Sequence, residues 1–199
     1  MAANARTQTL AQRFGATTAA TDGVAIVAAS LFLAALSQVE IRLPWTPVPV
    51  TLQTFGVFVI AAALGARRGV AAVLAYIAQG AAGLPVFAGG GAGVGHLLGP
   101  TGGYLAGFVG AAALIGCLAE RGWDRSLLRS FAAMFCGAVV IFACGLLQLS
   151  WFVPTRDLLA LGLIPFVPGA LLKITLATLL LPMLWNSLGR FGTRPPAAR

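Results

Sequence analysis

Long apolar stretches, separated by short polar or glycine-rich breaks, dominate the sequence. Their lengths suit membrane-spanning helices, which need about 20 apolar residues. We predict six such helices, over residues 23–38, 50–66, 69–82, 103–119, 130–152 and 170–188. Asp22 is expected to cap the first helix. Gly65, followed by Arg67 and Arg68, should end the second, and Pro182 should kink or loosen the last. The pattern therefore predicts an all-α polytopic membrane protein with six transmembrane helices.

Composition supports a membrane protein and excludes a soluble globular domain. The 199 residues are 59% hydrophobic and only 9% charged, with a mean hydropathy of +0.91, whereas soluble domains carry about a quarter charged residues. The net charge of +8 does not indicate nucleic-acid binding, because the arginines are scattered over loops without a dense basic run. Cys117, Cys136 and Cys144 lie inside apolar stretches and match no zinc spacing, so we interpret them as packing residues.

The basic residues predict an orientation in the membrane. If the N-terminus is cytoplasmic, ten basic residues fall on the cytoplasmic side: Arg6, Arg13, Arg67, Arg68, Arg121, Arg125, Arg129, Arg190, Arg194 and Arg199. Arg42 and Arg156 fall outside, and Lys173 lies within the sixth helix. Because short cytoplasmic loops carry an excess of Lys and Arg, this bias predicts that both termini are cytoplasmic.

The predicted helices and the distribution of basic residues divide the chain into three parts. We predict a cytoplasmic N-terminal lead-in over residues 1–22, a single six-helix membrane domain over 23–189 and a cytoplasmic tail over 190–199. A secretory signal peptide is an alternative for the first apolar stretch. It is disfavoured because its removal would leave five spans and spoil the charge pattern.

A glycine-rich, irregular segment lies between the third and fourth predicted helices. It holds nine glycines from 83 to 103, two prolines and the lone His96. Glycines at this density prevent a regular helix, yet the residues between them are apolar. Non-helical backbone at membrane depth is tolerated only where protein or a wet cavity covers it. We therefore predict that the segment walls a small-molecule cavity, which faces outward because the connections 40–49, 83–102 and 153–168 all fall on that side.

Lys173 is the strongest candidate for ligand binding. It is the only lysine and lies about one turn into the sixth helix, where a charge is costly unless it is functional or reaches the interface. We interpret it as a cationic clamp for a carboxylate, with Ala170 leaving room for the ligand beside it. Snorkelling of the side chain to the membrane surface is the alternative.

Further candidates surround the predicted cavity. Gln53 and Thr51 place an amide and a hydroxyl at cavity height, although they could instead tie helices together or bond to backbone. Phe87 and Tyr104 flank the glycines and could enclose a flat ligand, with core packing as the alternative; Gly89 completes the candidate set. For His96 a position in a surface loop is favoured over ligand contact.

Small residues recur at four-residue spacing at the start of the first helix: Ala16, Ala20, Ala25 and Ala29. Such faces permit close helix approach, either within the protein or in a groove for a partner's helix. By contrast, no pattern in the sequence predicts an enzyme, a metal site or a bound cofactor. There is no catalytic triad, paired-carboxylate site or phosphate-binding loop in a suitable context.

Five ordered motifs resemble the BioY family, the biotin-binding S components of energy-coupling-factor (ECF) transporters. They are P-V-P-V-T-L-Q at 47–53, L-G-A-R-R-G at 64–69, G-L-P-V-F-A-G-G at 83–90, L-G-P-T-G-G-Y-L-A-G-F at 98–108 and P-G-A-L-L-K at 168–173. The resemblance covers most of residues 44–175. It implies a six-helix protein of the bacterial cell membrane that binds biotin near the outer face.

The resemblance also implies partners and contacts. A transmembrane coupling (T) protein and cytoplasmic ATPases that use ATP would energise uptake, with the alanine face of the first helix against the coupling protein. The family's last motif usually reads P-G-D-L-L-K, in which the acidic residue contacts the ureido ring of biotin and the lysine lies near its carboxylate. Here the lysine is Lys173, but the acidic position is Ala170. Losing an acceptor for a buried N–H costs about 1–3 kcal/mol.

Two other classes of function remain as alternatives. A stand-alone secondary transporter of biotin or another small monocarboxylate would need an ion-coupling site, and the predicted spans offer no acidic residue for one. A membrane enzyme would need a nucleophile and a base, which one histidine and five mostly loop carboxylates do not supply. ATP dependence of uptake separates the S component from the secondary transporter, and product formation would single out the enzyme.

Overall fold

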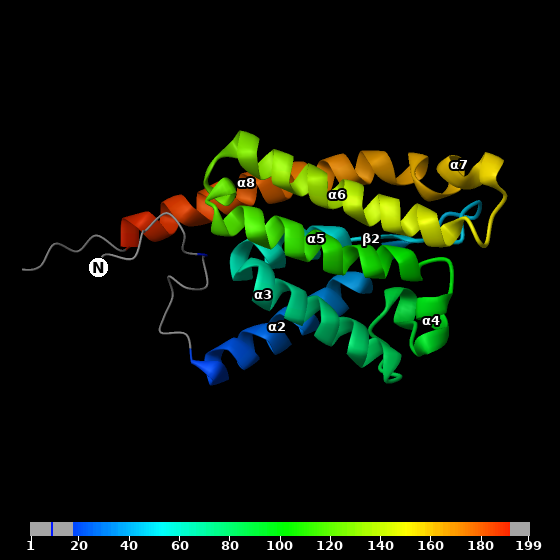
Figure 1. The fold of residues 1–199 in the computed structure, drawn as a ribbon, viewed down its shortest axis with the longest axis horizontal. Helices are drawn as coiled ribbons and strands as arrows, with labels where there is room; N and C mark the ends of the chain where they lie inside the picture. Colours follow the sequence, from blue (N-terminus) through cyan, green and yellow to red (C-terminus); the bar gives the residue numbers. More distant parts are fainter. Residues whose placement is uncertain (1–8, 10–17, 192–199) are drawn as a thin grey trace, which may run out of the picture.

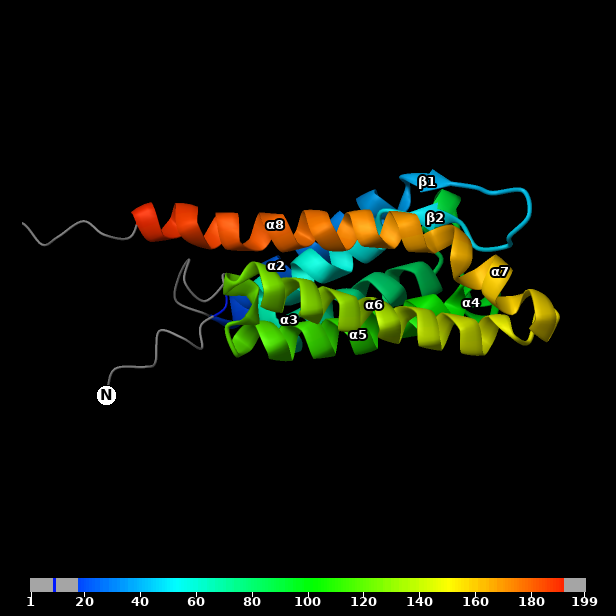
Figure 2. The same ribbon diagram turned by 90° about the horizontal axis from the view of Figure 1, so that it is seen from above.

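The computed structural model describes Thr9 and residues 18–191 of the chain, which form an elongated bundle of helices (Figures 1 and 2). In this part of the chain five stretches are long and apolar enough to cross a membrane. They are built on α2 (Ala19–Ser37), α3 (Gln53–Ala81), α5 (Gly102–Glu120), α6 (Leu127–Leu149) and α8 (Val167–Phe191). The prediction of a mostly helical protein with several membrane-spanning helices is thus confirmed.

Shorter elements occupy the connections that were predicted to be irregular. They are β1 (Glu40–Ile41), β2 (Val50–Thr51), α4 (Val94–Leu98), α7 (Leu158–Gly162) and the 3₁₀ turns Ala88–Gly90, Trp123–Arg125, Thr155–Asp157 and Ile164–Phe166. The two strands pair antiparallel, with Glu40 opposite Thr51. In Figure 2 these strands, α4 and α7 gather at one end of the bundle.

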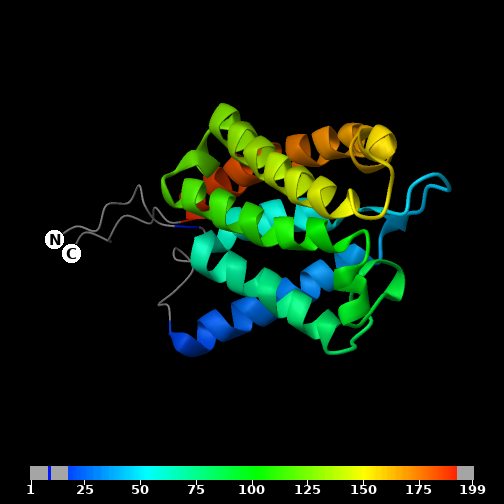
Figure 3. The ribbon, with the colours of Figure 1, turned by 45° about the vertical axis from the view of Figure 1, so that its right-hand side comes forward.

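The helix α3 folds back on itself at Gly65. Gly65 has φ 82° and ψ 178°, a conformation almost restricted to glycine, and it interrupts the helix. The amide of Gln53 donates to the hydroxyl of Tyr76 at 2.6 Å, although a straight helix would separate the two residues by about 35 Å. The two arms, 53–64 and 66–81, therefore run antiparallel (Figures 1 and 3), and they correspond to the predicted helices 50–66 and 69–82.

The turn at Gly65 is held by the end of α5. Glu120 Oε1 accepts a hydrogen bond from the Ala66 N–H at 2.9 Å, which satisfies a donor at the start of the second arm. A Cβ atom on Gly65 would lie 2.5 Å from that oxygen, and one on Gly116 would lie 2.3 Å from Ala66 N. Glycine at both positions allows α5 to approach the turn this closely.

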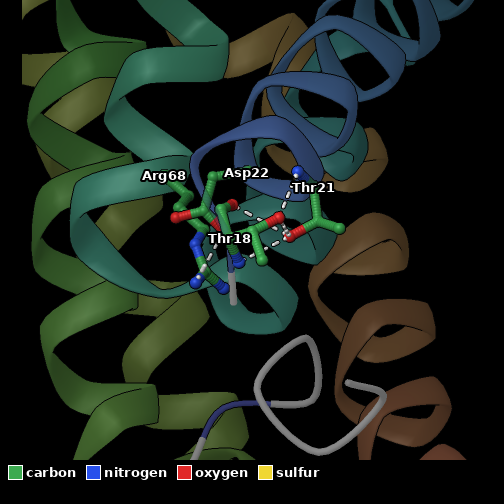
Figure 4. Close-up of polar contacts among 4 residues, drawn as sticks. All are labelled: Thr18, Thr21, Asp22 and Arg68. Atoms are coloured by element: carbon green, nitrogen blue, oxygen red, sulfur yellow. Dashed lines mark hydrogen bonds and ion pairs between the residues drawn. The ribbon is translucent and has the colours of Figure 1, made fainter. Parts of the chain in front are cut away.

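The start of α2 differs from the prediction, because Thr18 caps the helix and Asp22 does not. The Thr18 hydroxyl accepts from the Thr21 N–H, and the Thr21 hydroxyl accepts from the Thr18 N–H, a reciprocal capping box. The helix therefore begins at Ala19, four residues before the predicted start. Asp22 is left in the first turn, where its carboxylate binds Arg68 of α3 at 2.8 Å (Figure 4).

Large apolar side chains are exposed along the outer helices. The buried residues of α2 are Ser30, Leu33 and Ser37, which lie on one face of the helix. Val24 is 70% exposed. On α6, Leu128 is 79% exposed. A soluble protein rarely exposes so much contiguous apolar surface, so this surface is suited to lipid.

The two ends of the bundle differ in chemistry. The end on the left in Figure 1 holds the turn of α3, the α5–α6 connection and the end of α8. Five arginines lie in its connections or in the helical turns beside them: Arg67, Arg68, Arg121, Arg125 and Arg129. The opposite end holds the β-hairpin, α4 and α7 (Figure 2), and these elements surround the cavity described next.

Candidate ligand-binding site

A cavity lies at the end of the bundle opposite the arginine-rich connections, between the β-hairpin, α3, α5, α6 and α8. Its volume is about 70 Å³. This volume is smaller than that of most ligand pockets, about 300–1,000 Å³. Twelve of its nineteen lining residues are apolar, and the other seven are Thr51, Gln53, Thr54, His96, Thr101, Tyr104 and Lys173.

The structure brings six of the seven predicted ligand residues together in this cavity: Lys173, Gln53, Thr51, Phe87, Tyr104 and Ala170. They come from four separate parts of the sequence. The seventh, Gly89, does not line the cavity. Its φ of 63° forms a tight turn, and a Cβ atom there would lie 1.9 Å from Nη2 of Arg42. Gly89 is therefore placed to let the guanidinium of Arg42 pass over the backbone.

Lys173 is a buried cation without a carboxylate partner. It lies two turns into α8, is 9% exposed, and donates from Nζ to the carbonyl of Thr51. The ion pairs found among the described residues are Arg42–Glu40, Arg68–Asp22 and Arg156–Asp157, none of which includes Lys173. A backbone carbonyl compensates a desolvated ammonium only in part. An anion in the cavity would supply the missing compensation.

Gln53 joins the two arms of α3 at the cavity wall and also bonds to Thr51. Gln53 is 5% exposed. Its Oε1 accepts from the Thr51 hydroxyl at 2.9 Å, while its Nε2 donates to Tyr76. The alternative considered for Gln53, that it ties helices together, is thus observed. One amide N–H of Gln53 stays available, since the Tyr76 bond uses one of two.

Phe87 and His96 form an aromatic stack at the wall made by the glycine-rich segment. Phe87 is fully buried, and its ring centroid lies 4.8 Å from that of His96, with 17° between the planes. Phe87 also makes a T-shaped contact with Tyr76, with 5.6 Å between the ring centroids. A Cβ atom on Gly80 would lie 2.1 Å from the Phe87 ring, so this glycine makes room for it.

His96 was expected in a surface loop, but it lines the cavity. Its ring is held by Phe87, and Nε2 lies 3.2 Å from the Thr101 hydroxyl. Burial lowers the pKa of His96 below its usual 6.5, so the side chain is neutral at pH 7. Among the described lining residues, Lys173 is then the one charged group.

Tyr104 anchors a second aromatic group. Its hydroxyl donates to the carbonyl of Gly162 at 2.7 Å, and its ring lies 6.5 Å from Phe142 and 6.3 Å from Phe166. A Cβ atom on Gly145 would lie 2.3 Å from the Tyr104 ring. Core packing and cavity lining are therefore combined in this residue.

The sequence did not single out several lining residues. Four are phenylalanines, Phe58, Phe108, Phe142 and Phe166, and a fifth is Thr54. Helical spacing offers a signal for some of them, because Tyr104 and Phe108 are four residues apart and share a helix face. The same holds for Thr54 and Phe58. Phe142 and Phe166 reach the cavity through tertiary packing, for which the sequence has no local signal.

A second, more open hollow adjoins the cavity. It is lined in part by Glu40, Arg42 and Thr46, and it shares Pro49, Ala88, His96 and Thr101 with the first. Arg42 Nε and Glu40 Oε1 are 2.6 Å apart at its rim. The shared residues therefore separate the cavity from the outer hollow.

The sequence profile of the BioY family matches residues 6–190. The chain belongs to the BioY family. The resemblance inferred from the five motifs is thus confirmed. BioY of Thermotoga maritima, a biotin transporter, is 43% identical over 141 residues, which are 70% of this chain and 82% of that protein. BioY of Rhizobium etli, also a biotin transporter, is 37% identical over 148 residues, 70% of this chain and 79% of that protein.

A solved structure shares the fold. It is the crystal structure of the S-component for biotin from an ECF-type ABC transporter. The two structures match with a TM-score of 0.77 and 26% sequence identity, over 86% of this chain and 95% of the other. Because the BioY relatives and this structure are transporters or transporter subunits, the prediction that the chain is not an enzyme is confirmed.

Proposed function

We propose that this chain takes up biotin as the substrate-binding membrane subunit, or S component, of an ECF-type transporter. The observation that carries the proposal is the buried, unpaired Lys173 in an otherwise neutral cavity. The similarity to biotin transporters and to an S-component for biotin supports the identity of the ligand.

Biotin matches the cavity group by group. Its carboxylate would bind the Lys173 ammonium, and its thioether ring and apolar chain would lie against Phe87 and Tyr104. Its ureido edge needs hydrogen-bonding partners, of which the free amide N–H of Gln53 is one. Thr51 and Ala170 remain predicted contacts, supported by their position in the lining.

We further propose that the chain crosses the bacterial cell membrane six times, with each arm of α3 counted as one span. The first arm has twelve residues, about 18 Å of helix, and is short for a hydrocarbon core of about 30 Å. The residues of the β-hairpin, which precede this arm in the sequence, would complete the crossing. With the arginine-rich end inside, both termini are cytoplasmic and the cavity faces outward.

Energy for uptake would come from a transmembrane coupling protein and cytoplasmic ATPases. The arginine-rich connections within the described residues are short, so the ATPase is assigned to other chains. Of the alanines predicted to meet the coupling protein, Ala20 is exposed, Ala25 is half-buried and Ala29 packs against the core. Ala16 lies outside the described residues. This face therefore stays a prediction.

Equilibrium binding of biotin to the purified chain in detergent tests the proposed ligand. We expect the unsubstituted chain to bind and Lys173→Met, which keeps the length but removes the charge, to bind about 10- to 100-fold more weakly. Arg156→Gln is the matched control, because it removes a cation that is 85% exposed at the same end of the bundle. No binding by the unsubstituted chain, or equal binding by Lys173→Met, would contradict the proposal.

A further inference from the structure

Six of the seven polar side chains in the cavity lining are hydrogen-bonded within the protein. Thr51 bonds to Gln53, and His96 to Thr101. Tyr104 donates to the carbonyl of Gly162, and Lys173 to that of Thr51. The seventh is Thr54. Its hydroxyl oxygen is buried and has no partner among the described residues.

The position of Thr54 in α3 explains why its hydroxyl has no internal partner. A threonine inside a helix usually bonds to the carbonyl four residues earlier. Thr54 is the second residue of α3, and the residue four positions earlier is Val50, which belongs to β2. That carbonyl does not belong to the helix. A buried hydroxyl without a partner costs about 1–3 kcal/mol, so its presence in a cavity needs an explanation.

Thr54 is close in sequence to Thr51, whose carbonyl binds Lys173. The carbonyl of Thr51 accepts from the lysine, and Thr54 follows Thr51 by three residues, across the junction of β2 and α3. Both residues line the cavity together with Lys173. A hydroxyl and an ammonium that line one cavity are two donors, and a single carboxylate has two oxygens with which to accept from both.

We propose that Thr54 is a ligand-binding residue whose hydroxyl donates to the same carboxylate that Lys173 binds. The inference rests on the proposed function, since it takes the ligand to be a carboxylate such as biotin. Thr54 then contributes to specificity. The site distinguishes a free carboxylate from its ester through two donors, the charged ammonium of Lys173 and the neutral hydroxyl of Thr54. A charge-assisted hydrogen bond of this kind is shorter and stronger than one between neutral groups.

Three variants test the role of the hydroxyl through biotin affinity. Thr54→Val keeps the shape and removes the hydroxyl, and we expect about tenfold weaker binding. Thr54→Ser keeps the hydroxyl and should stay within about twofold. Thr178→Val is the matched control, because Thr178 also has a buried hydroxyl without a partner in the described chain, but it does not line the cavity. It should leave affinity unchanged.

Thermal unfolding separates ligand contact from a structural role. Removing a buried hydroxyl that has no partner in the free protein should leave the unfolding temperature of Thr54→Val equal to, or above, that of the unsubstituted chain. Weaker binding with unchanged stability supports ligand contact. A fall in both stability and affinity would overturn it, because the hydroxyl would then be structural.

A second ligand tests which group the hydroxyl meets. The methyl ester of biotin keeps the skeleton without the charge, and the loss caused by Thr54→Val should shrink from about tenfold to below about twofold. An equal loss with the ester would overturn the carboxylate assignment. If the unsubstituted chain binds biotin and Thr54→Val binds equally well, the Thr54 inference fails alone. If the unsubstituted chain binds no biotin, the proposed function fails and the inference falls with it.

Discussion

Ala170 lies one turn before Lys173 on α8, and both residues line the cavity. In the BioY motif that the chain resembles, this position is acidic. The methyl group here leaves the neighbouring ammonium without an acidic partner and offers no acceptor to an N–H of the ligand. A ligand bound in this cavity must therefore find its acceptors elsewhere, or bind with one hydrogen bond fewer.

Restoring the carboxylate is expected to strengthen biotin binding. Ala170→Asp would supply an acceptor for a ureido N–H, worth about 1–3 kcal/mol, which corresponds to at least about a fivefold gain in affinity. The measurement is equilibrium binding in detergent. Ala170→Asn is the control for charge, because it offers an acceptor of the same shape without the negative charge. If Ala170→Asp binds no more tightly than the unsubstituted chain, position 170 is not a ureido contact.

A lining residue could be predicted from the sequence where its type is unusual for the surrounding sequence. Lys173 was predictable because a lone charge inside an apolar helix demands a reason. Phe87 and Tyr104 stood out beside glycines. Thr54 did not, because a threonine near a helix start is common and its lack of a partner is visible only in three dimensions. His96 was placed at the surface because the sequence does not show the ring of Phe87 beneath it.

At the scale of elements, the turn of α3 depends on the positive φ of Gly65. Gly65→Ala would put a Cβ atom 2.5 Å from Glu120 Oε1 at φ 82°, and we expect it to cost about 1–3 kcal/mol of folding free energy. The measurement is the thermal unfolding temperature in detergent, which should fall. Biotin affinity should be retained in the folded fraction, because the turn lies at the end of the bundle away from the cavity.

Gly23→Ala provides the control for the turn. Gly23 lies in α2, and a Cβ atom there meets no atom within 4 Å, so alanine should leave the unfolding temperature unchanged or raise it slightly. Equal unfolding temperatures for Gly65→Ala and the unsubstituted chain would show that the turn relaxes without cost and would contradict the role given to its backbone conformation.

The helices were more predictable than the connections. The helices predicted over 103–119 and 130–152 lie within three residues of α5 and α6, because long apolar runs are a strong signal. The two-residue strands and the five-residue helices α4 and α7 are too short to show a period in the sequence. The capping of α2 by Thr18 was missed because Asp22 is an equally good cap in isolation, and only its pairing with Arg68 explains its different role.

At the scale of the whole molecule, the turn of α3 and the α5–α6 connection lie at one end of the bundle, and the β-hairpin, α4 and α7 lie at the other (Figures 1 and 2). The arginines Arg67, Arg68, Arg121, Arg125 and Arg129 belong to the first end, and residues of the β-hairpin and α4 line the cavity at the second. The positive charges favour a cytoplasmic position for their end, which leaves the cavity accessible from outside. A vitamin-uptake subunit needs this arrangement to capture its ligand. The orientation is therefore the property of the whole chain on which the proposed function depends most.

Single-cysteine labelling of intact cells measures this orientation directly. After Cys117, Cys136 and Cys144 are replaced by alanine, a cysteine is placed at exposed Thr155, beside the cavity end, or at exposed Ser126, in the α5–α6 connection. We expect a membrane-impermeant maleimide to label Thr155→Cys in intact cells and Ser126→Cys only after the membrane is opened. The cysteine-free chain controls for background, and retained biotin binding shows that each variant is folded. The reverse labelling pattern would place the arginine-rich end outside, and the cavity would then open to the cytoplasm, where it could not capture external biotin.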